Sequence, residues 1–148
     1  MLVKDFMTSE VTALQETDTL LDAAMIFVRS SFRHVPVLRD KKVVGIITER
    51  DVKQFAPSLL SRTSAEEYNQ IMETTPISRV MTREPACMSP SQPVFEAATI
   101  LHSKRVGCLP VVENGELVGI ITTTDLLGLL IQIMEDKGLG GAKPSSAS

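Results

Sequence analysis

The chain contains the same segment twice, 74 residues apart. When residues 3–52 are aligned with residues 77–126, fourteen of the fifty pairs are identical and no gap is needed. The clearest match is a stretch that reads Gly-Ile-Ile-Thr-x-x-Asp in both copies, at residues 45–51 and 119–125. A fixed period without insertions indicates one structural unit used twice. Because a unit of about 50 residues is near the lower limit for independent folding, we expect the two copies to bury their apolar faces against each other.

Each copy predicts the same order of secondary structure. In the first copy, one set of apolar residues has the spacing of a helix with one buried face: Leu20, Ala23, Ala24, Phe27 and Val28. An apolar run that contains proline, a turn and a second apolar run follow this helix. Asn114-Gly115, at the turn of the second copy, is typical of a hairpin. Another helix is expected to start near Thr48 and, in the second copy, near Thr122.

A short extended piece before the first helix completes the pattern of strand, helix, strand, strand, helix. We therefore expect an α/β (α+β) fold in which two βαββα repeats, residues 1–56 and 77–135, pack about a pseudo-twofold axis. The helices and strands of both repeats are expected to bury Leu20, Ala24, Phe27, Ile46, Ile47, Ala98, Leu101, Ile120 and Ile121.

The remaining residues predict a linker and a tail. In the linker, residues 57–76, Pro57 is expected to end the preceding helix because proline lacks a backbone donor. A run that begins Ser-Ala-Glu-Glu has the form of a capping box and predicts a short helix at about residues 64–74. Residues 136–148 are rich in Gly, Ser and Ala, so we expect a disordered tail.

The composition argues against several classes of protein. The net charge of −3 and the lack of a basic block disfavour a nucleic-acid partner. No apolar run is long enough to span a membrane, and residues 1–20 do not form a secretory signal. Cys87 and Cys108 lack the spacing of metal ligands, so no metal site is predicted and both are expected to be buried thiols in a reducing cytoplasm. Walker, nucleophile-elbow and HExxH motifs are all missing, which predicts that the chain is not an enzyme.

The repeated motifs resemble the CBS domain, named for cystathionine β-synthase. The resemblance consists of Met-Thr near the start, Ala-Ala in the first helix, a Pro-Val strand and Gly-Ile-Ile-Thr-x-x-Asp, in the same order twice. The two copies look like a CBS pair, or Bateman module, and residues 57–67 are similar to the linker of stand-alone CBS-pair proteins of acetoin utilisation. The resemblance implies a regulatory module that binds AMP, ADP, ATP or S-adenosylmethionine between the repeats and passes the change to another protein.

The Thr-x-x-Asp motif is the centre of the predicted ligand site. The first turn of a helix has unpaired N–H groups that attract phosphate. The hydroxyls of Thr48 and Thr122 can donate to phosphate or ribose, and the carboxylates of Asp51 and Asp125 can accept two ribose hydroxyls. Gly45 and its counterpart are expected to leave room for a base. The alternative is a structural one, because Thr-x-x-Asp is also a variant of the capping box, and both roles can coexist.

The two copies differ beside this motif. Arg33 and His34 precede the first Pro-Val strand, where the resemblance implies contacts to phosphate or base, whereas Gly107 and Cys108 stand in the second copy without charge. We therefore expect stronger binding near Asp51. The resemblance also implies backbone contacts from the extended segments at Thr12 and Cys87, and the pairing of these segments with each Asp stays open. The candidate ligand-binding residues are Arg33, His34, Thr48, Asp51, Val11, Thr12, Cys87, Cys108, Thr122, Thr124 and Asp125. Aliphatic walls for the base are expected from Val11, Leu14, Val35 and Ile46.

The last predicted helix, residues 125–134, has apolar residues around nearly all of its faces. One small module is not expected to bury all of them, and an exposed apolar patch usually marks an interface. The sequence therefore predicts a homodimer. An alternative function is a structural dimerisation module whose clefts bind no ligand, and the lack of an Arg-His pair in the second copy supports it.

Overall fold

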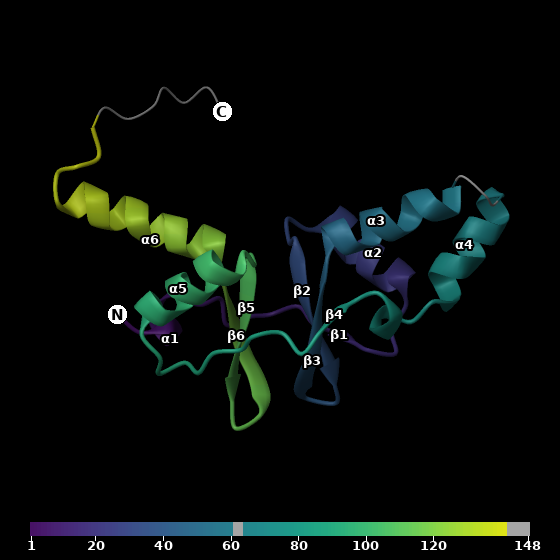
Figure 1. The fold of residues 1–148 in the computed structure, drawn as a ribbon, viewed down its shortest axis with the longest axis horizontal. Helices are drawn as coiled ribbons and strands as arrows, with labels where there is room; N and C mark the ends of the chain where they lie inside the picture. Colours follow the sequence, from purple (N-terminus) through teal and green to yellow (C-terminus); the bar gives the residue numbers. More distant parts are fainter. Residues whose placement is uncertain (61–63, 142–148) are drawn as a thin grey trace.

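The computed structural model describes residues 1–60 and 64–141 as a mixed α/β structure, in which two similar halves lie side by side (Figure 1). This architecture confirms the predicted fold class. The elements are α1 (Val3–Phe6), β1 (Leu14–Gln15), α2 (Leu20–Arg29), β2 (His34–Arg39), β3 (Lys42–Thr48), α3 (Glu49–Leu60), α4 (Ala65–Thr74), the 3-10 helix η1 (Ile77–Arg79), β4 (Thr82–Arg83), α5 (Val94–Lys104), β5 (Cys108–Glu113), β6 (Glu116–Thr122) and α6 (Thr123–Asp136).

The two hairpins have the same register, residue for residue. In the first repeat His34 pairs with Thr48, and in the second Cys108 pairs with Thr122. The pairing shifts at the same place in both hairpins, after Val37 in one and after its counterpart Val111 in the other. Strands β3 and β6 meet where Lys42 pairs with Glu116, so the hairpins join in one sheet with the strand order β1-β2-β3-β6-β5, and β4 pairs with β3. The repeat seen in the sequence is therefore a repeat of structure.

The opening segment of each repeat, residues 2–8 or 76–82, packs on the other repeat. Thr8 exchanges backbone hydrogen bonds with Ile120 of the second repeat at 2.8 and 2.9 Å. Thr82 pairs in the same way with Ile46 of the first repeat. A second pair of bridges has the same symmetry: Leu2 with Pro93, and Pro76 with Thr19. Each half of the molecule is thus completed by chain that belongs, in sequence, to the other half.

Gly45 and Gly119 allow this exchange. A Cβ atom on Gly45 would lie 2.8 Å from the carbonyl oxygen of Thr82 and 2.5 Å from Sδ of Met81. A Cβ atom on Gly119 would lie 2.8 Å from the carbonyl oxygen of Thr8, with similar crowding by Met7. The crossing segment occupies the space beside both glycines, so the prediction that they leave room for a base is wrong. Their hydrogen side chains permit close approach of two backbones.

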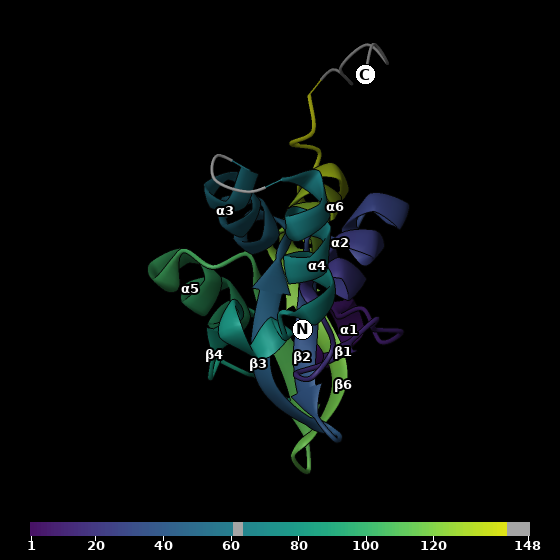
Figure 2. The same ribbon diagram turned by 90° about the vertical axis from the view of Figure 1, so that its right-hand side faces the viewer.

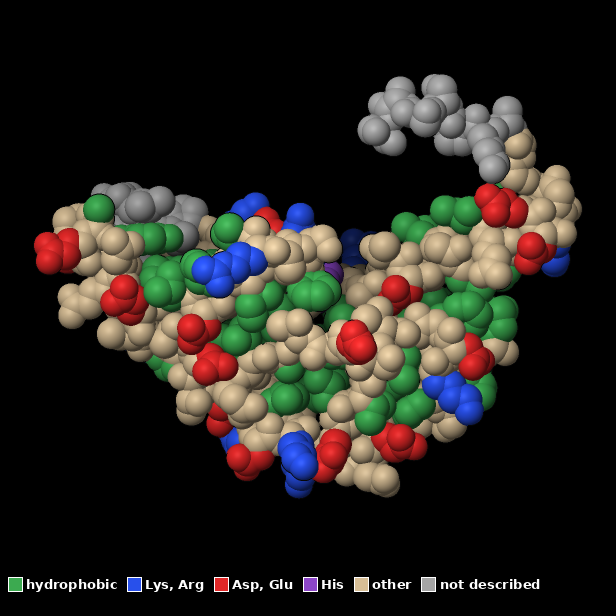
Figure 3. Space-filling model, turned by 180° about the vertical axis from the view of Figure 1, so that it is seen from behind, with side chains coloured by type: hydrophobic (Ala, Val, Ile, Leu, Met, Phe, Trp, Pro, Cys, Tyr) green, Lys and Arg blue, Asp and Glu red, His purple; other side chains and the backbone are tan. Residues whose placement is uncertain are grey.

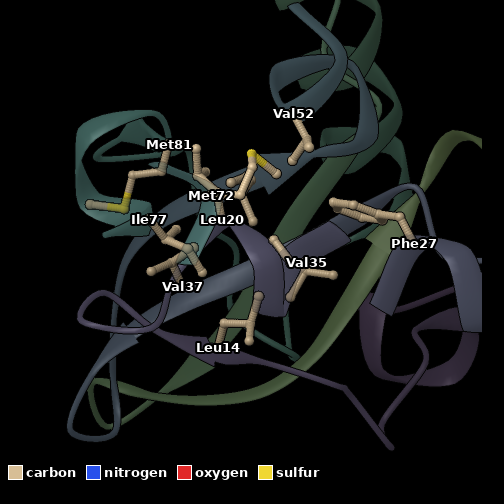
Figure 4. Close-up of a cluster of buried hydrophobic side chains, with 11 residues drawn as sticks. Leu14, Leu20, Phe27, Val35, Val37, Val52, Met72, Ile77 and Met81 are labelled. Atoms are coloured by element: carbon tan, nitrogen blue, oxygen red, sulfur yellow. The ribbon is translucent and has the colours of Figure 1, made fainter. Parts of the chain in front are cut away.

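The core consists of two main clusters, which are built from equivalent positions of the two repeats. In the first, side chains from α2, β2, α4 and η1 converge (Figure 4). This cluster includes Ile77 of the exchanged opening segment, and the second includes Val3 from the other one, both fully buried. Of the predicted core residues, all are buried except Ala24, which is half-buried, and Ala98, which is exposed. Each helix instead turns the neighbouring alanine, Ala23 or Ala97, to the core.

The linker contains the predicted helix, α4. The side chain of Ser64 caps this helix by accepting a hydrogen bond from the backbone N–H of Glu67 at 3.2 Å. Met72, on the same helix, is buried in the first core cluster. The prediction that Pro57 ends the preceding helix is wrong, because α3 continues to Leu60. A proline removes one backbone donor from a helix but need not end it. Of the predicted disordered tail, residues 142–148 lie outside the described residues.

Candidate functional site

A cleft of about 1070 Å³ opens between the two repeats. Figure 2 shows α3 and α5 on the same side of the molecule and α2 on the opposite side. The start of α3 forms one wall of the cleft, and the chain that follows α5 forms the other. The lining residues from the first repeat are Arg33, His34, Ile46, Thr48, Glu49, Arg50, Asp51, Lys53 and Gln54. Those from the second are Thr82, Glu84, Pro85, Ala86, Lys104, Arg105, Val106, Gly107, Cys108 and Leu109.

The Thr-x-x-Asp motif caps the helix that follows it. In the first repeat the backbone N–H of Thr48 donates to Asp51 Oδ2 at 2.9 Å, and that of Asp51 donates to Thr48 Oγ1 at 3.0 Å. The backbone N–H of Glu49 donates to the carbonyl oxygen of Arg33 at 3.1 Å. Two N–H groups of the first turn are therefore already satisfied, which contradicts the expectation that this turn offers them freely to phosphate. Binding of an anion here must depend mainly on side chains.

Asp51 keeps one carboxylate oxygen for a ligand. The residue is half-buried and lines the cleft. Its Oδ2 atom serves the cap, while Oδ1 makes no hydrogen bond within the described part of the chain. A carboxylate oxygen can accept two hydrogen bonds. Capping and contact with a hydroxylated ligand are thus compatible at Asp51.

The charges that line the cleft favour an anion. Five cationic residues (Arg33, Arg50, Lys53, Lys104 and Arg105) and three acidic ones (Glu49, Asp51 and Glu84) line it, whereas the whole chain has a net charge of −3. The cations come from both repeats, and clefts lined mainly by one sign of charge concentrate ligands of the opposite sign. Some of this charge is already paired, because Glu49 bridges Nε of Arg33, at 3.1 Å, and Nζ of Lys53.

His34 fits into the space that Gly107 leaves. A Cβ atom at Gly107 would lie only 2.7 Å from Nε2 of His34, so the ring rests against the glycine backbone. Burial lowers the pKa of His34, and the charge of Asp51 opposes this in part. Arg33-His34 and the counterpart Gly107-Cys108 therefore line the same cleft. The sequence shows that Gly107 lacks a charge, but it does not show that the missing side chain makes room for His34 of the other repeat.

Five of the candidate ligand-binding residues line this cleft: Arg33, His34, Thr48, Asp51 and Cys108. Cys108 is buried, and burial together with nearby Asp125 and Cys87 raises the pKa of its thiol to about 12. Its side chain is therefore a neutral wall at physiological pH. Of the predicted aliphatic walls, Ile46 lines the cleft, but Leu14 and Val35 lie in the first core cluster and are wrongly assigned.

The other candidates lie outside this cleft. Thr122 and Asp125 form the matching cap of α6, with hydrogen bonds of 2.9 and 3.2 Å, and Thr124 is exposed beside them. Val11 packs partly buried against Ile46, Cys108 and Ile120. Thr12 and Cys87 are exposed, so the prediction of a buried thiol is wrong for Cys87. The thiol of Cys87 donates to the carbonyl oxygen of Pro85 at 3.4 Å.

Lys104 and Arg105 belong to the second repeat, but they line the same cleft as Arg33. Pro85 and Ala86 were not singled out at all. They reach the cleft because the opening segment of the second repeat packs on the first repeat and carries residues 82–86 with it. Only knowledge of that exchange could have identified them. No sequence motif states that exchange directly.

No group of three or more His, Cys, Asp or Glu side chains in residues 1–60 and 64–141 is placed to hold a metal ion. No helix among these residues combines the length and apolar character required to cross a membrane.

Comparison with known proteins gives the family. The CBS domain model matches residues 3–58 and 77–139. A CBS domain-containing protein of Dictyostelium discoideum is 33% identical over 137 residues, which are 90% of this chain and 94% of that protein. A protein assigned to acetoin utilization (AcuB) in Vibrio cholerae has a crystal structure that is 31% identical, with a TM-score of 0.75, and the match covers 97% of this chain and 98% of that one.

A third match carries ligands. The CBS domain pair of protein MJ0100, crystallised with 5′-methylthioadenosine and S-adenosyl-L-methionine, is 25% identical, with a TM-score of 0.72 over 88% of this chain and 99% of that one. The repeated motifs, the matched hairpins and these similarities agree, and the chain belongs to the CBS-domain family as a tandem pair.

Proposed function

We propose that this chain is a non-catalytic regulatory module that binds an adenosine nucleotide in the cleft between its repeats. The observation that carries the proposal is the gathering of five cationic residues from both repeats around one cleft of about 1070 Å³. The similar pair MJ0100 holds adenosine compounds, which supports the adenosine part. The excess of cations favours AMP, ADP or ATP over S-adenosylmethionine, whose sulfonium carries a positive charge.

Each part of the nucleotide has a suitable wall. Four cations supply charge-assisted donors for phosphate: Arg33, Lys53, Lys104 and Arg105. The free Oδ1 of Asp51 accepts from the ribose hydroxyls, away from the phosphate that it would repel. Ile46 and Ala86 supply an apolar surface for the base. A nucleotide bound in this way touches both repeats at once, so its binding energy acts on their relative position, and a regulated partner protein would sense that change.

Thermal unfolding tests this function. A ligand that binds only the folded chain, at 100 times its Kd, adds about 2.7 kcal/mol of stability, which for a chain of this size raises Tm by several degrees. We expect such a rise with millimolar AMP, ADP or ATP, and a smaller one with S-adenosylmethionine. Inosine monophosphate is the control for the base. If none of these compounds changes Tm, the structural dimerisation module becomes the better account.

A specific observation favours dimerisation as a second role. α6 buries Leu129 but leaves Leu127, Leu130 and Ile131 exposed by 55%, 50% and 58%. In Figure 3 hydrophobic side chains gather along this helix, on the upper edge of the molecule. We infer that a second copy covers them.

The expected particle in light scattering has twice the 16.2 kDa of one chain. Ile131→Lys should yield monomers, while Gln132→Lys, at an exposed polar neighbour, should not; a monomeric wild type at micromolar concentration would contradict the dimer.

A further inference from the structure

Glu49 occupies a central place in the cleft wall. It is the first residue of α3, and its carboxylate bridges two cations, Arg33 at 3.1 Å and Lys53 one helical turn further along. The Glu49 side chain is only 23% exposed, whereas those of Arg33 and Lys53 are 59% and 73% exposed. The carboxylate therefore pairs with two cations that are more exposed than itself, at the wall of the cleft.

The fold does not require this carboxylate. The counterpart of Glu49 in the second repeat is Thr123, and α6 begins there with the same cap and the same register. The backbone N–H of Thr123 donates to the carbonyl oxygen of Gly107 at 3.0 Å, as that of Glu49 does to Arg33. What Glu49 adds to the common structure is only its charge and its two ion pairs.

We propose that Glu49 is an internal counter-ion that the phosphate of the ligand displaces, an inference that rests on the proposed nucleotide binding. A phosphate offers acceptors of the same kind and charge to the same donors, Nε of Arg33 and Nζ of Lys53. It cannot share them closely with Glu49, because like charges repel. Binding therefore breaks two ion pairs before it makes its own. Glu49 thereby lowers the affinity for phosphorylated ligands and leaves unphosphorylated ones unaffected.

Calorimetry with AMP and adenosine on three proteins tests this: wild type, Glu49→Gln and Glu84→Gln. Glu84 is a matched control, because it lines the same cleft but makes no ion pair with any described residue. Exposed ion pairs contribute little each, so Glu49→Gln should tighten AMP binding by about three- to tenfold. Its affinity for adenosine should change less than about twofold, and Glu84→Gln should tighten AMP binding by less than about twofold.

The Nε–H resonance of Arg33 in NMR spectra provides an independent readout. In the wild type it should shift when AMP is added, as Arg33 leaves Glu49. In Glu49→Gln it should already be shifted before AMP is added.

Weaker AMP binding by Glu49→Gln would overturn the proposal, since Glu49 would then be positioning Arg33 for the ligand. If Glu84→Gln tightened AMP binding as much as Glu49→Gln, the proposal would also be overturned, because the effect would then come from the net charge of the cleft alone. If wild type binds adenosine and AMP equally, phosphate recognition fails; if it binds neither, the proposed function itself fails.

Discussion

The starts of α3 and α6 have the same backbone and the same cap but different surroundings. In each, threonine and aspartate exchange hydrogen bonds of 2.9 Å in one direction and 3.0 or 3.2 Å in the other. The three residues after the threonine read Glu-Arg-Asp in the first repeat and Thr-Thr-Asp in the second. The repeated residues thus serve folding in both places. The cationic residues that line the cleft are not repeated: Arg33, Arg50, Lys53, Lys104 and Arg105.

The largest difference between the two sites is expected from their aspartates. Asp51→Ala should weaken AMP binding by ten- to a hundredfold, or about 1–3 kcal/mol, because ribose hydroxyls lose their acceptor. Asp125→Ala should change AMP binding little, since Asp125 does not line the cleft. Both variants lose a helix cap worth about 0.5–2 kcal/mol, so their Tm values should fall alike. Calorimetry after a Tm measurement separates the two effects; a greater loss of binding in Asp125→Ala would reverse our ranking of the sites.

The two glycines at the crossing should instead behave alike. Gly45→Ala and Gly119→Ala each place a Cβ atom 2.8 Å from a backbone oxygen that side-chain rotation cannot move. We expect each to destabilise the protein by about 1–2 kcal/mol, or a fall in Tm of roughly 3–8 °C. Gly128→Ala is the control, because a Cβ atom there meets nothing within 4 Å. A wild-type Tm in either crossing variant would contradict the tight exchange of segments.

The smallest effect is a pH dependence that only the first repeat should have. Burial lowers the pKa of His34 below its ordinary value of 6.5, so the unfolded chain binds the proton more readily than the folded one. The stability from neutral His34 is therefore complete above about pH 6.5 and is lost as pH falls toward the lowered pKa. Tm should fall less between pH 7.5 and pH 5.5 in His34→Gln than in wild type. Its counterpart Cys108 stays neutral throughout that range, and equal slopes in both proteins would exclude His34 as their source.

The sequence repeat predicts the fold well because each helix or strand expected in one copy must also fit the equivalent residues of the other copy. The hairpin register, the capped starts of α3 and α6 and the helix after Ser64 all follow from local spacing. The exchange of opening segments could not be predicted in the same way. An offset of 74 residues shows that Thr8 and Thr82 are equivalent, but not which repeat each one packs on. Hydrogen bonds between distant segments decide that, and they leave only the two glycines as a trace in the sequence.

The site is predicted less completely for the same reason. Arg33, His34, Thr48 and Asp51 lie close together in sequence or on neighbouring strands, and they do meet. Lys104 and Arg105 reach this cleft only because of how the halves face each other. Arg105 also has a left-handed backbone conformation, with φ of 54°, which ends α5 and turns the chain toward β5. A single charged residue in a turn carries no periodic signal from which that direction could be inferred.

The exchanged opening segments have a consequence for how the chain can be divided. Cleavage between α3 and α4 would separate residues 2–8 from the second repeat, whose core holds Val3, and residues 76–82 from the first, whose core holds Ile77. Each fragment would carry the piece that the other lacks. We therefore expect the nicked protein to elute as one particle under native conditions, and two fragments expressed together to assemble by complementation.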